Sequence, residues 1–199
     1  QAYALMARAA GVELPPTRLI AIGPRYRCFA VQRFDRLQGQ RRLHMHSLAG
    51  LLHADFRVCG LDYADLFRVT LALTRDHQQL LRAFRQMLFN IAAHNRDDHG
   101  KNFAFLMDAD GVWRLSPAFD LVWSHGPGGE HSTSVAGIGR DPGIEQVRTL
   151  ARQFDVRPAE LELLRAAVND AVARWRVYAE EAGCSRRIRT AVATSLRAV

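Results

Sequence analysis

The chain has 199 residues, of which 48% are hydrophobic and 24% charged, a composition that supports a buried core and excludes bulk disorder. No apolar run approaches the roughly 20 residues of a membrane span, and no leader-like segment opens the chain, so we expect a cytoplasmic protein without membrane contact. The formal net charge is +7, but the 26 arginines and one lysine behind it are scattered, which permits a nucleic-acid partner without indicating a specific binding site.

The first part of the chain predicts one short helix and a few strands. Residues 2–11 have a helical pattern that Gly11 ends, because glycine adopts the left-handed conformation of a helix C-terminus at little cost. Strand-like runs, the first two joined by a Gly-Pro turn, cover residues 19–22, 27–33 and, more weakly, 42–46.

From residue 62 onward the hydrophobic period is mostly helical. Residues 62–95 predict two helices with a break near Arg75 and Asp76. A β-hairpin follows, because Asp110-Gly111 separates two strand-like runs, 102–107 and 112–115. The remaining chain predicts a short strand at 132–136 and helices at 144–154, 158–181 and 187–197. This order has no βαβ alternation, so we expect an α+β fold in which helices predominate.

The segment that carries chemistry is 91–103, I-A-A-H-N-R-D-D-H-G-K-N-F. The only lysine of the chain, Lys101, lies in it, and Asp97 precedes Asn102 by five residues in an H-x-R-D-x-x-x-x-N order. Phosphoryl transfer uses this spacing, because the aspartate orients or accepts the proton of the attacking hydroxyl while the asparagine oxygen binds a magnesium ion at the same phosphate. A solvated polar loop is the alternative interpretation of this composition.

A second magnesium ligand is expected on a nearby loop. Asp120 follows Asn102 by 18 residues, after the predicted hairpin. Magnesium prefers hard oxygen ligands and usually takes one or two protein groups together with water and phosphate. Asn102 and Asp120 fit that set of donors, while a buried capping aspartate is the alternative for Asp120.

These motifs make the sequence resemble a known family. D-D-H-G-K-N-F at 97–103 and L-S-P-A-F-D at 115–120 closely resemble the C-terminal lobe of HipA-like serine/threonine kinases, the toxin components of bacterial toxin–antitoxin systems. The stretch A-V-Q-R-F-D-R at 30–36 is similar to the family's V-E-R-F-D-R segment, with Gln32 in place of glutamate, and H-S-T-S at 131–134 also fits. The resemblance therefore covers essentially the whole chain.

The resemblance implies a role for each matching residue. Asp97 would be the catalytic base that engages the substrate hydroxyl. Asn102 and Asp120 would bind Mg²⁺. Contacts to the nucleotide, ATP, would come from Gln32, Arg33 and Phe34 around the adenine and from His99, Gly100, Lys101, Asn102, Phe119 and Asp120 around the phosphates and the metal.

The resemblance also implies an architecture, a protein-kinase-like C-lobe with a small β element and a β-hairpin carrying the active-site loops. Residues 1–46 would connect the lobes through short strands, and residues 47–199 would form the helical lobe. No second lysine exists and no glycine-rich loop precedes residue 23, so the N-terminal ATP lobe is expected to be absent or supplied by a separate chain. We therefore expect weak nucleotide binding and little activity alone; sub-micromolar affinity for Mg-ATP would contradict this.

The partners implied are those of the family. They are a protein substrate phosphorylated on serine or threonine, such as an aminoacyl-tRNA synthetase, and a helix-turn-helix antitoxin (HipB-like). DNA would be reached only indirectly, through the antitoxin.

Two other functions stay open. One is a metal-dependent hydrolase, because 94–99 resembles an H-x-H-x-D-H pattern, although Arg96 stands where a histidine should be and further ligands would have to come from His125 or His131. The other is a non-catalytic module that binds a DNA-binding antitoxin. Tightly bound zinc would favour the hydrolase, and magnesium needed only with nucleotide would favour the kinase.

Other conspicuous residues are expected to be structural. Cys28, Cys59 and Cys184 form no C-x-x-C pair, which favours reduced thiols and argues against zinc bound by thiolates. Trp123 and Trp175 are both expected in the core.

Overall fold

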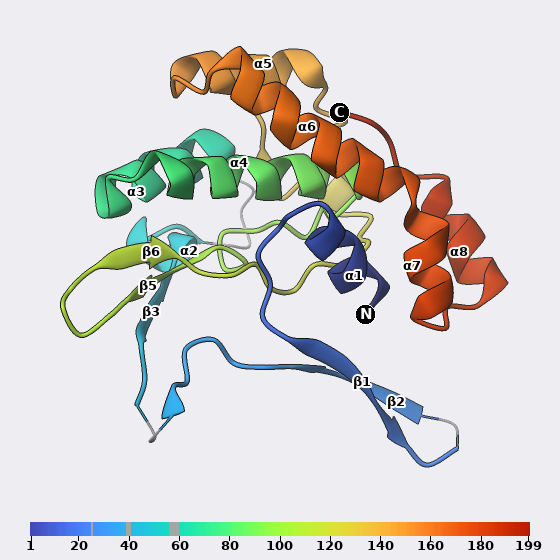
Figure 1. Cartoon of the computed structure of the whole chain (residues 1–199). Coiled ribbons are helices and arrows are strands. Elements are labelled where there is room, and N and C mark those ends of the chain that lie inside the picture. Colours follow the sequence, from blue (N-terminus) through green and yellow to red (C-terminus); the bar gives the residue numbers. More distant parts are fainter. Residues whose placement is uncertain (25, 39–40, 56–59) are drawn as a thin grey trace.

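The computed structural model describes residues 1–24, 26–38, 41–55 and 60–199. Its helices and strands confirm a mixed fold in which helices predominate (Figure 1). The helices are α1 (Ala2–Ala9), α2 (Leu48–Leu51), α3 (Tyr63–Thr74), α4 (His77–Ala92), α5 (Ile144–Gln153), α6 (Pro158–Ala173), α7 (Trp175–Glu181) and α8 (Arg186–Ala193). The strands are β1 (Thr17–Ile22), β2 (Tyr26–Val31), β3 (His44–Ser47), β4 (Leu61–Asp62), β5 (Ala104–Met107), β6 (Trp113–Leu115) and β7 (Thr133–Ser134), and a 3-10 turn, η2, covers Pro127–Gly129.

The break predicted near residues 75 and 76 separates α3 from α4. Arg75 ends α3 in the left-handed conformation, with φ +51°, and the Asp76 carboxylate accepts a hydrogen bond from the Gln78 N–H at 2.8 Å. Asp62 and Asp65 form a reciprocal capping box at the start of α3. Local capping chemistry thus fixes where both helices begin.

The core is built around α3 and α4, which lie side by side in the middle of the molecule (Figure 1). Phe67 of α3 stacks on Phe84 of α4 with ring centroids 4.1 Å apart. Helix α6 covers one side of α4, the three-stranded sheet lies on the other, and α1 packs against α6 and α7. The apolar faces of all these elements meet in one continuous hydrophobic cluster.

One predicted helix is two helices in the structure. The pattern at 158–181 indicates a continuous helix, but Arg174, at φ −91° and ψ 16°, separates α6 from α7. The bend places Trp175 edge-on to Tyr3, with ring centroids 5.5 Å apart, and its indole N–H donates to the Arg189 carbonyl at 3.0 Å. Tertiary packing of Trp175 therefore overrides local helix propensity, and the predicted burial of this side chain is confirmed at 3% exposure.

Three small sheets complete the fold. Strands β3, β5 and β6 form an antiparallel sheet in that order, which confirms the hairpin predicted on either side of Asp110-Gly111. The parallel pair β4 and β7 sets Leu61 opposite Thr133 and Asp62 opposite Ser134. That pairing brings the 131–134 segment to the start of α3, where it borders the candidate site.

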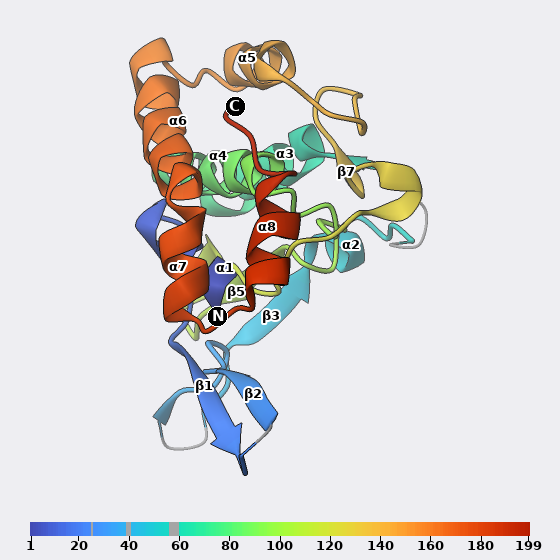
Figure 2. The same ribbon diagram turned by 90° about the vertical axis from the view of Figure 1, so that its right-hand side faces the viewer.

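The antiparallel hairpin of β1 and β2 projects from the helical body (Figure 2). It belongs to the part of the chain, residues 1–46, that we assign to a connecting segment, and that boundary stays a prediction. Helix α1, which precedes the hairpin, packs against the helical body. No helix in the described ranges is long and apolar enough to cross a membrane. Cys28 and Cys184 are free thiols, and Cys59 lies outside the described residues.

Candidate functional site

The candidate site is the 94–103 loop, which joins α4 to β5. The chain leaves α4 through His94, whose φ of +54° is left-handed, and the Asn95 N–H bonds to the Asn90 carbonyl at 2.9 Å. The Ser124 N–H donates to the His94 carbonyl at 3.1 Å, so the segment after Asp120 runs beside the loop. At the far end, the N–H groups of Leu48 and Ala49 donate to the carbonyls of Phe103 and Gly100, each at 2.9 Å.

Arg96 and Asp98 both point into the protein. The Arg96 guanidinium bonds to the Gly129 carbonyl and pairs with Asp141 at 2.5 Å, with only 7% of its side chain exposed. The Arg96 carbonyl accepts from the hydroxyl of Ser132 at 2.9 Å and from its N–H at 3.2 Å. The loop is therefore bonded on one side to the segment that follows Asp120 and contains η2.

Asp98 lies at the centre of a buried cluster. Its Oδ2 accepts from the Tyr63 hydroxyl and from His131 Nδ1, both at 2.8 Å. Its Oδ1 accepts from the N–H groups of Ser132 at 2.9 Å and Thr133 at 3.3 Å. The side chains of Asp98 and His131 are 0% and 1% exposed. We call these five residues the Asp98 cluster.

The Asp98 cluster continues into α4 through amide side chains. The Asn90 Nδ2 donates to the Tyr63 hydroxyl at 2.9 Å, and the Asn95 Nδ2 donates to the Asn90 Oδ1 at 2.9 Å. Buried polar groups are costly unless bonded, so a chain of bonds of this kind stabilises one arrangement of the loop.

Asp97 faces the opposite way from its two neighbours. Its side chain is 46% exposed, and its Oδ1 lies 3.7 Å from His99 Nε2. The contrast resembles the alternation of a strand, in which successive side chains point to opposite faces. The carboxylate predicted to be the catalytic base is thus the solvent-accessible one of the two adjacent aspartates.

Asn102 is held close to Asp97 by the backbone. Its Nδ2 donates to the Asp97 carbonyl at 2.8 Å, and the residue is 9% exposed. That bond fixes the orientation of the amide and leaves Oδ1, a hard oxygen, as the atom available to a metal. Asp120 offers an exposed carboxylate. The chemistry of these two donors fits Mg²⁺, which favours amide and carboxylate oxygens.

The residues between Asp97 and Asn102 form a tight turn. The Lys101 N–H lies 3.3 Å from His99 Nδ1, and the Lys101 side chain is exposed. Gly100 is buried, and a Cβ built on it would lie 2.5 Å from Leu61 Cδ1 and 3.3 Å from the Ala49 backbone nitrogen. Close packing against Leu61 and Ala49 therefore leaves little room for a side chain at this position.

The family-like motifs at 30–36 and 115–120 contact each other through aromatic rings. Phe34 and Phe119 lie with ring centroids 5.7 Å apart, although 85 positions separate them in the sequence. Gln32 and Arg33 are exposed, and Arg33 forms a bidentate pair with Asp35 at 2.6 and 2.8 Å. The hydrogen bonds between the two side chains lower the pKa of Asp35 and raise the pKa of Arg33. Arg33 thus orders the chain beside Phe34.

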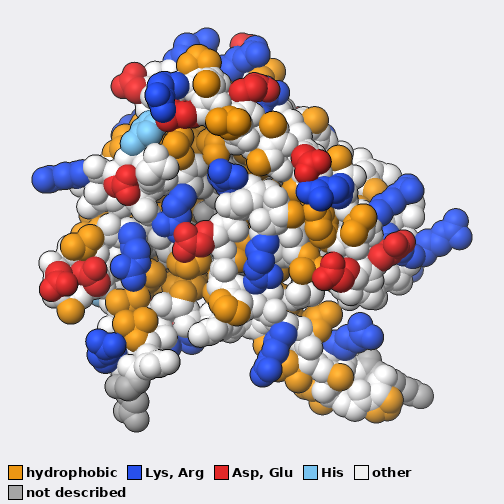
Figure 3. Space-filling view, viewed as in Figure 1, with side chains coloured by type: hydrophobic (Ala, Val, Ile, Leu, Met, Phe, Trp, Pro, Cys, Tyr) orange, Lys and Arg blue, Asp and Glu red, His pale blue; other side chains and the backbone are white. Residues whose placement is uncertain are grey.

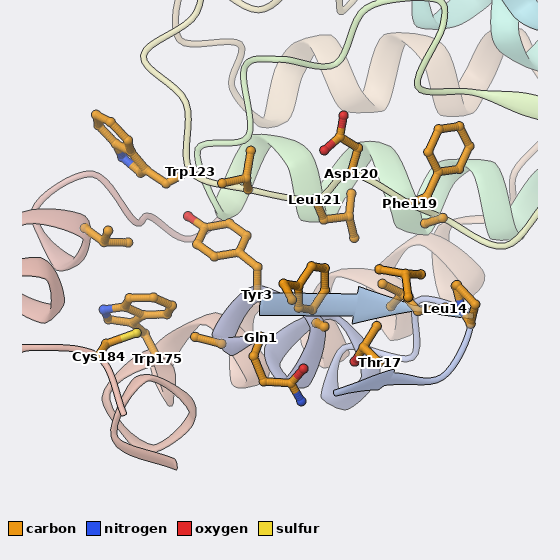
Figure 4. A pocket seen from close by; sticks show the side chains of 18 of the residues that line it. Gln1, Tyr3, Leu14, Thr17, Phe119, Asp120, Leu121, Trp123, Trp175 and Cys184 are labelled. Atoms are coloured by element: carbon orange, nitrogen blue, oxygen red, sulfur yellow. The ribbon is translucent and has the colours of Figure 1, made fainter. Parts of the chain in front are cut away.

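Asp120 borders an apolar pocket of about 430 Å³ (Figure 4). Its walls come from α1, the β1–β2 hairpin, the 118–123 segment, α7 and α8, and neither Asp97 nor Asn102 lines it. Asp120 has a left-handed φ of +56°. Its carboxylate is directed away from Tyr3 and Trp175 in Figure 4. The alternative of a buried capping aspartate is wrong, because Asp120 is exposed.

The prediction that Trp123 lies in the core is wrong. The residue is 38% exposed, and its ring stacks on His94 with centroids 6.0 Å apart and planes at 15°. The segment around it forms neither helix nor extended strand, and Ser124 pairs with Asn95 of the loop in an isolated bridge. Burial, followed by the positive charge of Arg96, lowers the pKa of His94 to about 4, so the imidazole beside Trp123 is neutral near pH 7.

The ligand set of a metal hydrolase is not assembled in the part of the chain that the structure describes. No group of three or more His, Cys, Asp or Glu side chains is placed there to hold a metal ion. His131, one of the additional ligands considered, bonds to Asp98 inside the protein. Arg96 occupies the middle of the pattern and pairs with Asp141.

Sequence reasoning assigned no role in phosphoryl transfer to Tyr63, Asp98 or His131. Asp98 and His131 appeared within the family-like motifs, without a role of their own, and as metal ligands of the alternative hydrolase. The available signal was the H-S-T-S stretch at 131–134, which matches the family motif but has no obvious chemistry until its backbone and imidazole are seen against Asp98.

Comparisons with known proteins show which proteins this chain resembles. A family model described as the HipA-like C-terminal domain matches residues 1–175. HipA of Shewanella oneidensis MR-1, solved with HipB and its operator DNA, superposes with a TM-score of 0.73 at 20% identity over 96% of this chain and 51% of that chain. A Haemophilus influenzae protein named "Putative kinase" is 27% identical over 103 residues, covering 47% of this chain and 30% of that protein.

The chain thus spans about half the length of the HipA structure and less of the Haemophilus protein. The structural match, at its low identity, establishes the shared fold. The family model covers well over half of the chain, and the motifs at 97–103 and 115–120 lie inside the matched range. This protein belongs to the HipA-like C-terminal domain family.

Proposed function

We propose that this chain is the C-terminal lobe of a HipA-type toxin kinase, which transfers the γ-phosphoryl group of ATP to a serine or threonine hydroxyl of a protein. The observation that carries the proposal is the placement of Asp97, exposed between two inward-pointing residues and bonded through its carbonyl to Asn102. Family membership and the named kinase relative support it.

Each proposed role follows from what the side chain can reach. The Asp97 carboxylate accepts the proton of the substrate hydroxyl while the hydroxyl oxygen forms a bond to the γ-phosphorus of ATP. The bond between the γ-phosphorus and the β–γ bridging oxygen breaks, and ADP is released. Asn102 Oδ1 and the Asp120 carboxylate would hold Mg²⁺. When bound, the ion neutralises charge on the phosphate oxygens.

The remaining residues would bind the nucleotide. His99, Gly100 and Lys101 form the turn that faces the phosphates. Gln32, Arg33 and Phe34 would contact the adenine, with Phe119 packed against Phe34 at the same place. Arg33 is already paired with Asp35, so we assign its contribution to the shape of the backbone rather than to its charge.

The test is phosphate transfer by the full-length natural protein. With radiolabelled ATP and Mg²⁺, Asp97→Asn should lower kcat about 100-fold or more, because it removes the proton acceptor, while calorimetric affinity for Mg-ATP stays within about twofold. The matched control is Asp110→Asn, an exposed aspartate on the β5–β6 turn. Full activity in Asp97→Asn would contradict the proposal.

The proposed partner is a helix-turn-helix antitoxin of the HipB type, with DNA contacted through the antitoxin. The Shewanella HipA was solved with HipB and its operator DNA, which supports this assignment. The proposed substrate is a component of translation such as an aminoacyl-tRNA synthetase, as the family resemblance implies. A protein that binds the antitoxin but neither binds nor hydrolyses Mg-ATP would instead be a non-catalytic interaction module.

A further inference from the structure

The arrangement of 96–98 against 129–133 points to an additional layer of the site, and the inference rests on the proposed function. Arg96 bonds to Gly129 and Ser132, and Asp98 bonds to His131, Ser132 and Thr133. The Thr133 hydroxyl also donates to the Asp98 carbonyl at 2.5 Å. Asp97 is therefore flanked on both sides by residues fixed to the same segment.

We propose that Asp98 and His131 are positioning residues for the catalytic carboxylate of Asp97. Neither touches the substrate. Asp98 holds the backbone on the C-terminal side of Asp97, and His131 holds Asp98 at the junction with β7. The buried hydrogen bonds of Asp98, rather than contacts of the Asp97 side chain itself, then fix the direction in which the Asp97 carboxylate points.

Saturation of the Asp98 carboxylate supports this assignment. A carboxylate offers about four lone-pair positions, and four donors occupy them, two on each oxygen. With its oxygens fully bonded and its side chain 0% exposed, Asp98 cannot reach a substrate proton. Of the two adjacent aspartates, one is free to act on a substrate and the other is committed to holding the loop.

The four donors come from two regions, the start of α3 and the segment that enters β7, and the network reaches a third element, α4, through Tyr63. Tyr63 opens α3, His131 and Thr133 lie at β7, and the Asn90 bond to Tyr63 extends the network into α4. The parallel pairing of β4 with β7 fixes the first two relative to each other. A shift of the loop would thus break bonds to several elements at once.

The substitution that tests the inference is His131→Phe, which keeps an aromatic ring and removes the donor to Asp98. His131→Asn is the conservative partner, because its amide N–H occupies about the place of Nδ1. Misplacement of a catalytic group by about 1 Å costs on the order of 100-fold in rate, so His131→Phe should lower kcat about 10- to 100-fold. The KM for ATP should stay within about twofold, and His131→Asn should recover most of the lost kcat.

A second measurement does not require activity. Amide hydrogen exchange of residues 96–102 should be about tenfold faster in His131→Phe than in wild type or His131→Asn. Tyr63→Phe, which removes one donor at almost constant volume, should show the same change at smaller size. His125→Phe, an exposed histidine six residues away, should change neither exchange nor kcat.

The outcomes separate the two proposals. If wild-type protein transfers no phosphate, the proposed function fails, and the exchange comparison still decides whether His131 positions the loop. If wild type is active but His131→Phe has wild-type kcat and exchange, the positioning inference is overturned. A rise in KM for ATP with unchanged kcat would also overturn it, since that result indicates a binding role.

Discussion

The 94–103 loop and the β1–β2 hairpin differ in which side chains they bury and which they expose to solvent. In the loop, several charged and polar side chains, those of Arg96, Asp98 and Asn102, are buried and form hydrogen bonds or ion pairs, with Asp98 at 0% side-chain exposure. The hairpin instead exposes apolar residues, including Tyr26 at 73%, Ile22 at 54% and Phe29 at 50%. Figure 3 shows hydrophobic side chains on the projecting hairpin and mixed charges over the helical body.

This contrast separates two sources of order. Buried hydrogen bonds make the loop depend on contacts from α3, α4 and β7. A single substitution in its interior should therefore disturb the whole loop. The hairpin is held mainly by its own ladder of main-chain pairs from Thr17↔Val31 to Ile22↔Tyr26, and its exposed side chains add little to folding. Substitutions in the two regions should therefore differ widely in effect.

The largest effect is expected from Asp98→Ala. Removing one partner of a buried charged cluster leaves Tyr63 and His131 without an acceptor, and such losses cost about 3–5 kcal/mol. Asp97→Ala, one residue away and 46% exposed, should change the free energy of unfolding by about 0.5 kcal/mol or less. Urea denaturation of both variants measures the difference, and equal losses would remove the distinction between the two aspartates.

Gly100→Ala should have the next largest effect. The new methyl group would meet Leu61 Cδ1 and the Ala49 backbone, and overpacking of this kind costs about 1–3 kcal/mol. The double variant with Leu61→Ala sharpens the test, because it removes one of the two contacts. If the cost of Gly100→Ala is the same in both backgrounds, the clash with Leu61 is not its cause.

A smaller effect is expected from the titration of His94. Its pKa falls from the ordinary value of 6.5 to about 4 in the folded protein, so the unfolded chain binds this proton first and stability decreases as pH falls from about 6.5 to 4. His94→Gln should reduce the pH dependence of the urea midpoint in that window. An unchanged slope would show that His94 ionises alike in both states.

The smallest effect is expected in the hairpin. Tyr26→Ser should change the free energy of unfolding by about 0.5 kcal/mol or less, because the side chain is 73% exposed. The matched control is Phe105→Ala in β5, a fully buried aromatic, for which about 3–5 kcal/mol is expected. A large loss in Tyr26→Ser would show that the hairpin is coupled to the core.

Local sequence signals predicted much of the fold. The helical period located α3 and α4, the Arg75-Asp76 break matched their caps, and Asp110-Gly111 marked the β5–β6 hairpin. These features depend on residues close together in the chain. The division at Arg174 was missed because its cause, the packing of Trp175 on Tyr3, joins positions far apart.

The candidate site shows the same limit. Spacing and family motifs point to Asp97, Asn102 and Asp120, and the roles of these residues stay predictions. The role of Asp98 depends on donors more than 30 positions away, at 63 and 131–133, which no local pattern reveals. Trp123 was misplaced for a related reason, because apolar character alone does not distinguish a core residue from one stacked on a surface imidazole.

The contact between Phe34 and Phe119 couples the evolution of two motifs that lie far apart in the sequence. Because the two partly buried rings contact each other, a substitution at one position changes the packing of the other ring. Substitutions at Phe34 in the R-F-D segment are then constrained by the residue at 119 in the A-F-D segment. Paired substitutions at these positions are the pattern to expect among descendants of the same ancestor.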